Sequence, residues 1–284
     1  MKMNNIMKAD LSAYINNIDN YEDSLFKYRK VNDRAKESLE KNEFYFSDPK
    51  EFRDENDCKL ILCYKGTLDE IKDHFGNAYT NIRQDIKETE DGKFVFYPDR
   101  KKTSYLRVFC LSEFCNEKSM WKDYAENDKG FCIEFKTRKL DDSHIVLLSE
   151  SEVYPKMGKF FSFNRVTYLP FSPEAVNLLS IDRGKSIISH LLYKGENYQF
   201  ENEFRAILDT DYFNKGPTKK FAKESLKSII FGHETPIDDI KDICKIIDEH
   251  YIQKKYSVNI YQMGDAVENN LRERNKLDIN KFIK

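Results

Sequence analysis

Residues 198–208 read YQFENEFRAIL and alternate between apolar and polar side chains. Successive side chains of a β-strand point to opposite faces, so this alternation predicts a strand. One face of that strand would carry Glu201, Glu203 and Arg205 in a row. The row could face a substrate, or it could simply meet water, because half-buried antiparallel strands ordinarily alternate in this way.

The composition is that of a folded chain with balanced charge. The chain has 284 residues, of which 40% are hydrophobic and 14% aromatic, enough for a sizeable core. The formal net charge is −2, which does not indicate an electrostatically driven nucleic-acid binder. No apolar run approaches ~18 residues, so we expect no membrane span. The N-terminal residues lack an apolar signal region and are interpreted as mature protein.

Cysteine and histidine spacing indicates neither a zinc site nor a disulfide framework. The six cysteines contain no CxxC pair, and the five histidines are scattered. Free cysteines in apolar runs fit a reducing cytoplasm, where we expect the protein to work without a bound metal. GxGxxG and GxxxxGK are both missing from the sequence, which disfavours nucleotide binding of the Rossmann or P-loop kind.

Strands and helices are interspersed without a regular βαβ rhythm. Apolar periodicity predicts strands at 24–30, 43–47, 105–112, 130–136, 164–169, 198–208, 226–232 and 256–263. It predicts helices at 5–20, 32–42, 67–91, 117–127, 172–194 and 235–251. This order favours an α+β fold with mixed, largely antiparallel sheets and flanking helices over a doubly wound sheet.

The expected domain organisation is simple. A single α+β domain would span 24–264, after an N-terminal helical extension at 1–23 and before a polar, loosely held tail at 265–284. Residues 67–91 would form a charged helical insertion, because their apolar residues recur near helical spacing.

Three further stretches carry candidate functional side chains. FKYR at 26–29 ends an expected strand with an arginine, which can clamp a phosphate or lie on the surface. VFCLSE at 108–113 ends another with Ser112, which can hold a ribose or phosphate oxygen or fill a turn. Trp121 and Tyr124 share a helix face, and such a pair can stack on a planar ring or pack in the core.

The order of these motifs resembles a bacterial domain family of unknown function related to AbiGi-type abortive-infection proteins. Its members carry a YR near the start, an FSxPxxF, an MWxxYAxxxxGxCIxF and a late ExExR, which the chain matches over roughly residues 24–232. The chain departs from it at Tyr198, where members often have Trp, and at Arg53-Asp54, where they often have Asn-Asp. The resemblance implies a toxin or effector of antiviral defence.

A second resemblance is to ADP-ribosyltransferases of the Arg–Ser–Glu type. Those enzymes carry an Arg on the first strand, a Ser at the end of a middle strand, and an ExE on a later strand. Arg29, Ser112 and Glu201-x-Glu203 follow that order. The chain lacks the full Ser-Thr-Ser of these enzymes, because its serine stands between a leucine and a glutamate. The resemblance implies an ADP-ribosyltransferase-like core with NAD as substrate.

The resemblance also implies a role for each residue in breaking the nicotinamide–ribose bond. Glu203 would bind the ribose 2′-hydroxyl and stabilise positive charge in the transition state, and Glu201 would orient or deprotonate the acceptor. Two neighbouring carboxylates also push one pKa upward, which suits a base. Arg29 would hold the pyrophosphate and Ser112 would support the geometry. The other expected cofactor-binding residues are Arg205, Tyr28, Trp121 and Tyr124.

Three interpretations follow. The first is a transferase toxin or effector whose acceptor is a protein, a nucleic acid or water, with room for an inhibitory partner protein. The second is a non-catalytic defence or interaction protein, whose ExExR strand is structural or binds a partner. The enzyme interpretation requires Arg29, Ser112 and Glu203 to meet at one cleft. The third, a nuclease, needs carboxylates around a metal, and its local candidates are Asp48, Asp54, Glu55 and Asp57.

Overall fold

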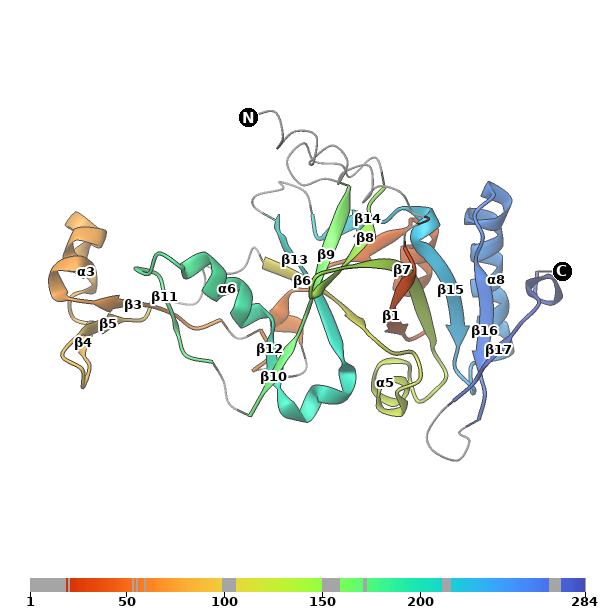
Figure 1. Ribbon diagram of the computed structural model, residues 1–284, viewed down its shortest axis with the longest axis horizontal. Coiled ribbons are helices and arrows are strands. Elements are labelled where there is room, and N and C mark those ends of the chain that lie inside the picture. The colour runs from red at the N-terminus through yellow and green to blue at the C-terminus, as the bar shows by residue number, and fades with distance from the viewer. Residues whose placement is uncertain are drawn as a thin grey trace.

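Six strands close into a barrel-like sheet at the centre of the computed structural model (Figure 1). Their order is β1-β6-β13-β9-β8-β7, and β7 pairs again with β1. Every neighbouring pair in this ring is antiparallel. The strands are β1 (Asp23–Arg29), β6 (Leu106–Ser112), β7 (Phe131–Leu140), β8 (Ser143–Leu147), β9 (Phe160–Arg165) and β13 (Glu203–Asp209). The structure describes residues 19, 21–52, 54, 56–58, 60–98, 106–149, 159–170, 173–210, 216–265 and 272–283.

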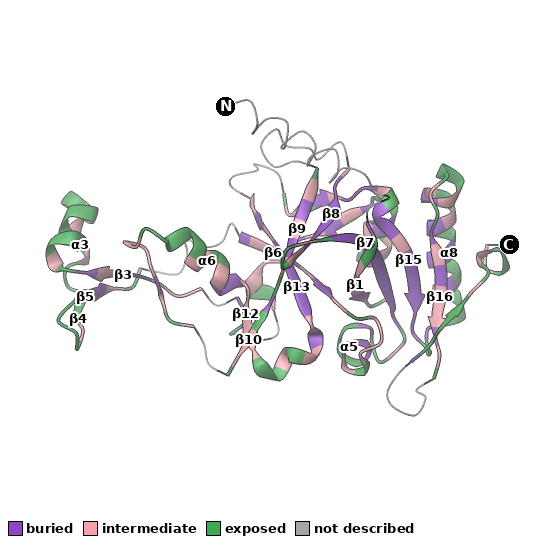
Figure 2. Cartoon of the chain, in the orientation of Figure 1, coloured by how far each residue is buried: buried purple, intermediate pink, exposed green. Residues whose placement is uncertain are grey.

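Phenylalanine side chains fill the inside of the barrel. The rings of Phe44 and Phe109 lie 4.5 Å apart, and Phe44 also meets Phe135 at 5.1 Å. Such ring pairs stabilise a core beyond the area that they bury. Figure 2 shows the barrel strands as largely buried. A short sheet of β2 (Glu43–Tyr45) with β14 (Thr218–Lys220), together with α2 (Asp33–Glu40), adds side chains to the same core.

The barrel continues past β7 into three more strands. These are β15 (Leu226–Phe231), β16 (Asn259–Met263) and β17 (Arg274–Lys276). The parallel strands β15 and β16 are linked by α8 (Ile237–His250). This helix buries a face of isoleucines at helical spacing, including Ile240, Ile243 and Ile247, against the core, while its other face is exposed (Figure 2).

A smaller sheet stands apart from the barrel, at the left of Figure 1. It contains β3 (Leu62–Gly66), β4 (Lys87–Glu88), β5 (Phe94–Phe96) and β11 (Val176–Asn177). It carries α3 (Leu68–Phe75), whose first turn is closed by a capping box between Thr67 and Glu70, and α4 (Tyr79–Ile82). The helical insertion expected at 67–91 therefore ends at residue 82, and a hairpin of β4 and β5 follows.

Between the two sheets, β10 (Thr167–Leu169) pairs with β12 (Tyr193–Gly195) and α6 (Arg183–Leu191) lies beside them. The helix expected over 172–194 is thus limited to nine residues. The remaining α-helix near the barrel is α5 (Lys118–Tyr124). Short 3-10 segments are η2 (Pro49–Glu51), η3 (Gly76–Ala78), η6 (Glu196–Glu201), η7 (Lys223–Ser225), η8 (Ile252–Lys254) and η9 (Ile279–Lys281).

The predicted class is confirmed as a mixed α+β arrangement with largely antiparallel sheets. The tail differs from the expectation, because Leu277, Ile279 and Phe282 pack against the core and β17 pairs with β16. The helix predicted at 5–20, and with it most of the N-terminal extension, lies outside the described residues. In the part of the chain that is described, no helix combines the length and apolarity needed to cross a membrane.

Candidate functional site

A pocket opens where β1 and β6 separate. The two strands share a single residue pair, Phe26 with Ser112, whereas β1 pairs with β7 along its whole length. The pocket has a volume of about 510 Å³, large enough for a small-molecule ligand. Lys27 and Arg29 of β1 line one side of it, and Cys110 and Ser112 of β6 line another. The pocket therefore lies at the open seam between these two strands.

Arg29, Ser112 and Glu203 all line this pocket, as the enzyme interpretation requires. Glu201, Tyr28 and Tyr124 line it as well. Among the expected site residues, Trp121 and Arg205 are not part of the lining. The strands that carry the arginine, the serine and the second glutamate lie side by side in the order β1-β6-β13.

The ExExR segment is not one continuous strand, in contrast to the prediction. Residues 196–201 form the 3-10 helix η6, Asn202 adopts a left-handed conformation with φ of 41°, and β13 begins at Glu203. Asparagine tolerates this conformation better than most residues, which lets the chain turn here. Ser112 Oγ donates a hydrogen bond of 2.7 Å to the carbonyl oxygen of Glu201, so the serine holds this turn against the end of β6.

Arg205 is buried beneath the pocket and binds acids instead of lining the cavity. Its side chain has no exposed area, and its Nε and Nη2 lie 2.7 and 3.0 Å from the two carboxylate oxygens of Glu203. Nη2 also lies 2.8 Å from Asp57, and Nη1 donates to the carbonyl oxygen of Leu191 at 2.8 Å. The expected cofactor contact of Arg205 is thus replaced by support of Glu203.

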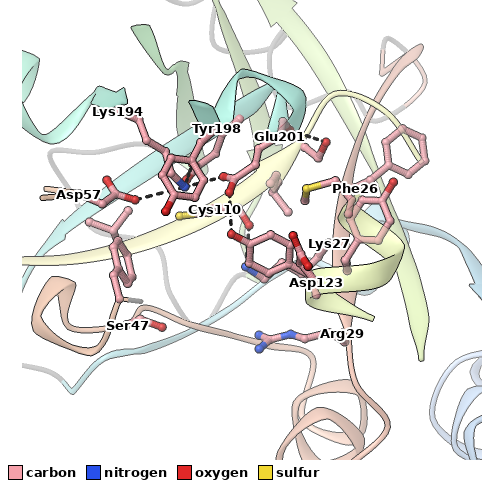
Figure 3. Close-up of a pocket in the computed structure, with 18 of the residues that line it drawn as sticks. Phe26, Lys27, Arg29, Ser47, Asp57, Cys110, Asp123, Lys194, Tyr198 and Glu201 are labelled. Carbon is pink, nitrogen blue, oxygen red and sulfur yellow. Dashed lines mark hydrogen bonds and ion pairs between the residues drawn. The ribbon is translucent and has the colours of Figure 1, made fainter. Parts of the chain in front are cut away.

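Lys194 is the functional candidate that sequence reasoning missed. Its ammonium lies 2.5 Å from Glu201, 3.2 Å from Glu203 and 3.2 Å from Asp57, and 6% of its side chain is exposed. Figure 3 shows Lys194 between Asp57 and Glu201. It lines the pocket and also lies 4.9 Å from the centre of the Tyr198 ring. A lysine seven residues before Glu201 carries no periodic pattern that would have marked it.

The two glutamates have opposite protonation tendencies. Burial raises the pKa of Glu201 to about 7, with Lys194 opposing and Glu203 reinforcing the shift. Burial also opposes ionisation of Glu203, but the guanidinium of Arg205 and the ammonium of Lys194 outweigh it and lower its pKa. Glu203 is therefore a permanent anion at neutral pH, and Glu201 can accept a proton there.

Two basic side chains, Arg29 and Lys27, line the opposite side of the pocket. Arg29 lies across the pocket from Lys194 and Glu201 (Figure 3), and its Nε is buried with no hydrogen-bond partner among the described residues. Burial and the charge of Arg34 lower its pKa to about 10, so it stays charged near neutral pH. Lys27 Nζ donates a hydrogen bond of 2.8 Å to the carbonyl oxygen of Cys110. Burial and the nearby charge of Arg29 lower the pKa of Lys27 to about 8. This side suits an anionic group.

Of the aromatic candidates, Tyr124 is the one placed for ligand contact. It is 37% exposed, and its hydroxyl donates a hydrogen bond of 2.6 Å to Oε1 of Glu201. Tyr28 packs edge-on against Trp121 at 5.2 Å and donates its hydroxyl to the carbonyl oxygen of Phe114. Trp121 is fully buried and donates its ring nitrogen to the carbonyl oxygen of Cys115. Stacking by Trp121 on a ligand is therefore replaced by core packing.

Two of the acids named for the nuclease interpretation are held in ion pairs. Asp57 is engaged by Arg205 and Lys194, and Asp48 pairs with Arg107 at 3.4 Å. Glu55 lies outside the described residues. Among those that are described, no group of three or more His, Cys, Asp or Glu residues could hold a metal ion.

One family comparison bears on this site. Residues 120–206 match DUF2971, a family of proteins of unknown function. The DUF2971 segment begins in α5 and ends in β13, so it contains Tyr124, Lys194 and both glutamates but neither Arg29 nor Ser112. This agrees with the expected resemblance to a domain of unknown function, and the relation to AbiGi-type proteins stays a prediction. No curated protein and no solved structure matches the chain.

Proposed function

We propose that the protein is an ADP-ribosyltransferase-like enzyme that cleaves NAD at the nicotinamide–ribose bond. The observation that carries the proposal is the meeting of Arg29, Ser112 and Glu203 in one pocket, on three neighbouring strands. A macromolecule or water would accept the ADP-ribose. A role as a cytoplasmic toxin or effector in antiviral defence follows from the family resemblance alone and belongs to the same proposal.

The charges of the pocket suit two parts of NAD, the pyrophosphate and the ribose that carries nicotinamide. Arg29 has a buried guanidinium whose Nε has no hydrogen-bond partner among the residues that the structure describes, and Lys27 stands two residues before it on β1. Together they would hold the pyrophosphate. At the opposite side, ionised Glu203 would face the ribose and its bond to nicotinamide. Tyr124, partly exposed at the rim of the carboxylates, would stack on a ring.

The reaction would need no resident cofactor. The bond between ribose C1′ and the nicotinamide nitrogen breaks, and its electron pair leaves with nicotinamide, which becomes neutral. Glu203 stabilises the positive charge that develops on the ribose. An oxygen of water or of the acceptor bonds to C1′, and its proton passes to Glu201. The pKa of Glu201, raised to about 7, suits a base at neutral pH.

A structural role for the ExExR segment is the second candidate, and burial favours it. Glu201, Glu203 and Arg205 are exposed by 3%, 4% and 0%. A buried ion-pair network can hold turns and strands together without any catalytic purpose. The two candidates separate on activity, because only an enzyme loses turnover when a side chain changes and the fold stays intact.

The test is release of nicotinamide from NAD by the purified protein. We expect release by the wild type and a loss of about 100-fold or more in Glu203→Gln, because an electrostatic contact to the transition state is removed. Arg29→Leu should weaken NAD binding. Glu37→Gln and Arg183→Leu alter exposed residues outside the pocket and serve as matched controls that keep wild-type activity. No release by the wild type, with cell lysate offered as acceptor, would favour the structural role.

A further inference from the structure

The ammonium of Lys194 contacts three carboxylates at once. Oxygens of Glu201, Glu203 and Asp57 lie 2.5, 3.2 and 3.2 Å from its Nζ. The lysine comes from β12, and η6 then leads the chain back so that Glu201 faces it seven residues later. The contacts to Glu201 and Glu203 are hydrogen bonds, and the contact to Asp57 is an ion pair.

The three carboxylates do not share their cations evenly. Arg205 binds Glu203 and Asp57, whereas Lys194 is the only cation among the described residues that forms an ion pair with Glu201. Within these ion pairs, three carboxylates face two cations. Glu201 is paired with one of these cations, whereas Glu203 and Asp57 are each paired with both.

We propose that Lys194 is a positioning residue that keeps Glu201 ionised and aimed into the pocket, so that Glu201 can act as the base. This inference rests on the proposed function for the role of Glu201 in turnover. The carboxylate is held from two sides, by Lys194 at Oε2 and by the hydroxyl of Tyr124 at Oε1. Both contacts form with the ionised carboxylate as acceptor.

Other charged groups also face Glu201 and set its pKa. Glu203 on β13 raises it, while Lys194 and the hydroxyl of Tyr124 lower it against the effect of burial. Asp57 lies on the far side of Lys194, and Lys27 of β1 interacts with both glutamates across the pocket. Loss of the lysine charge should therefore leave Glu201 protonated at neutral pH, and loss of the Asp57 charge should favour its ionised form.

The experiment compares Lys194→Met, Lys194→Arg and Asp57→Asn with the wild type. The pKa of Glu201 is measured by NMR as the pH titration of its side-chain carboxyl carbon, which Glu201→Gln identifies by its disappearance. The pH dependence of nicotinamide release is measured in parallel. Lys36→Met, which breaks a partly exposed ion pair between α2 and Asp242 of α8, is the control.

Lys194→Met should raise the pKa of Glu201 by about one unit or more, because an adjacent opposite charge is lost. Turnover at pH 7 should fall about tenfold and recover at higher pH. Lys194→Arg should stay close to the wild type, and Asp57→Asn should shift the pKa downward. A purely structural lysine would lower activity equally at every pH, without a pKa shift of opposite sign in the two variants, and this result would overturn the proposal.

The two readouts keep the proposals separable. If the wild type releases no nicotinamide, the proposed function fails, but the NMR titration still decides whether Lys194 controls Glu201. If Lys194→Met does not fold, Asp57→Asn carries the test, since its neutral side chain keeps the shape of aspartate. An unchanged Glu201 titration in Asp57→Asn would then refute the inference.

Discussion

Glu203 and Arg205 stand two residues apart on β13 and are joined through both carboxylate oxygens, at 2.7 and 3.0 Å. The arginine side chain is fully buried and that of the glutamate is 5% exposed. The two buried charges are tolerated because each compensates the other. Asp57 and Lys194 add further ion pairs to this network. The anion at the base of the pocket is thus supported from beneath by a cation that no ligand reaches.

Arg205→Met should destabilise the protein strongly. The change leaves Glu203 and Asp57 buried with less compensation, which typically costs about 3–5 kcal/mol. Urea unfolding followed by circular dichroism would measure it. Lys36→Met removes an ion pair whose side chains are 24% and 59% exposed, and we expect a change of at most about 1 kcal/mol. Equal effects of the two variants would contradict the buried network.

Ser112→Ala should lower both stability and activity. The serine is 2% exposed, and its hydroxyl donates to the carbonyl oxygen of Glu201. Loss of a buried donor costs about 1–3 kcal/mol and would loosen the turn that carries the base. Thermal unfolding checks the first effect and nicotinamide release the second. Ser38→Ala, on the partly exposed surface of α2, should stay within about 0.5 kcal/mol of the wild type.

Stability should fall between about pH 4.5 and pH 7 because of Glu201. Its pKa rises from 4.5 in the unfolded chain to about 7 in the fold, so the folded state binds more protons across this window. The stabilisation is complete below the unfolded value and is lost as the pH rises through the folded value. Urea midpoints measured from pH 4 to 9 should show this slope in the wild type and a flatter one in Glu201→Gln. An identical slope in both would exclude Glu201 as its source.

Gly130→Ala should disrupt the start of β7. A Cβ at this position would lie 2.2 Å from the carbonyl oxygen of Arg29 and 2.9 Å from that of Ala125, both of them backbone atoms. Relief of such a clash costs about 1–3 kcal/mol and would displace Arg29 from the pocket. Gly184→Ala in α6 meets nothing within 4 Å and should stabilise the helix by about 1 kcal/mol. Thermal unfolding of both variants compares them, and similar melting temperatures would refute the argument.

Much of the fold follows from local patterns. The helix at α2 begins after Asn32, whose side chain caps the amide of Ala35, and α8 follows the spacing of its isoleucines. The strands β1, β6, β7 and β15 fall close to the expected ranges, because buried strands are rich in apolar residues. The errors lie where short strands replace expected helix, as after residue 82, since strands of two or three residues are too short to show a periodicity.

Some residues of the candidate site could be predicted from local patterns, and others could not. Its arginine, serine and glutamates could be named from the sequence because each stands beside a local pattern, a strand end or an ExExR. Lys194 and Asp57 could not be assigned their roles, because their partners are set by tertiary contacts. Asp57 accepts a hydrogen bond from Arg205, which lies 148 residues further along the chain. A hydrophobic pattern indicates that a residue is buried, but it does not identify the residue that it contacts.

The sequence by itself determined the α+β class, most of the long strands and the residue types available for chemistry. Tertiary structure alone decided that β1 and β6 separate to form the pocket, that Glu201 lies in a turn, and that Arg205 forms an ion pair with Glu203. The reason is physical. Local propensity acts over a few residues, whereas a buried charge is stable only where distant segments bring it a partner.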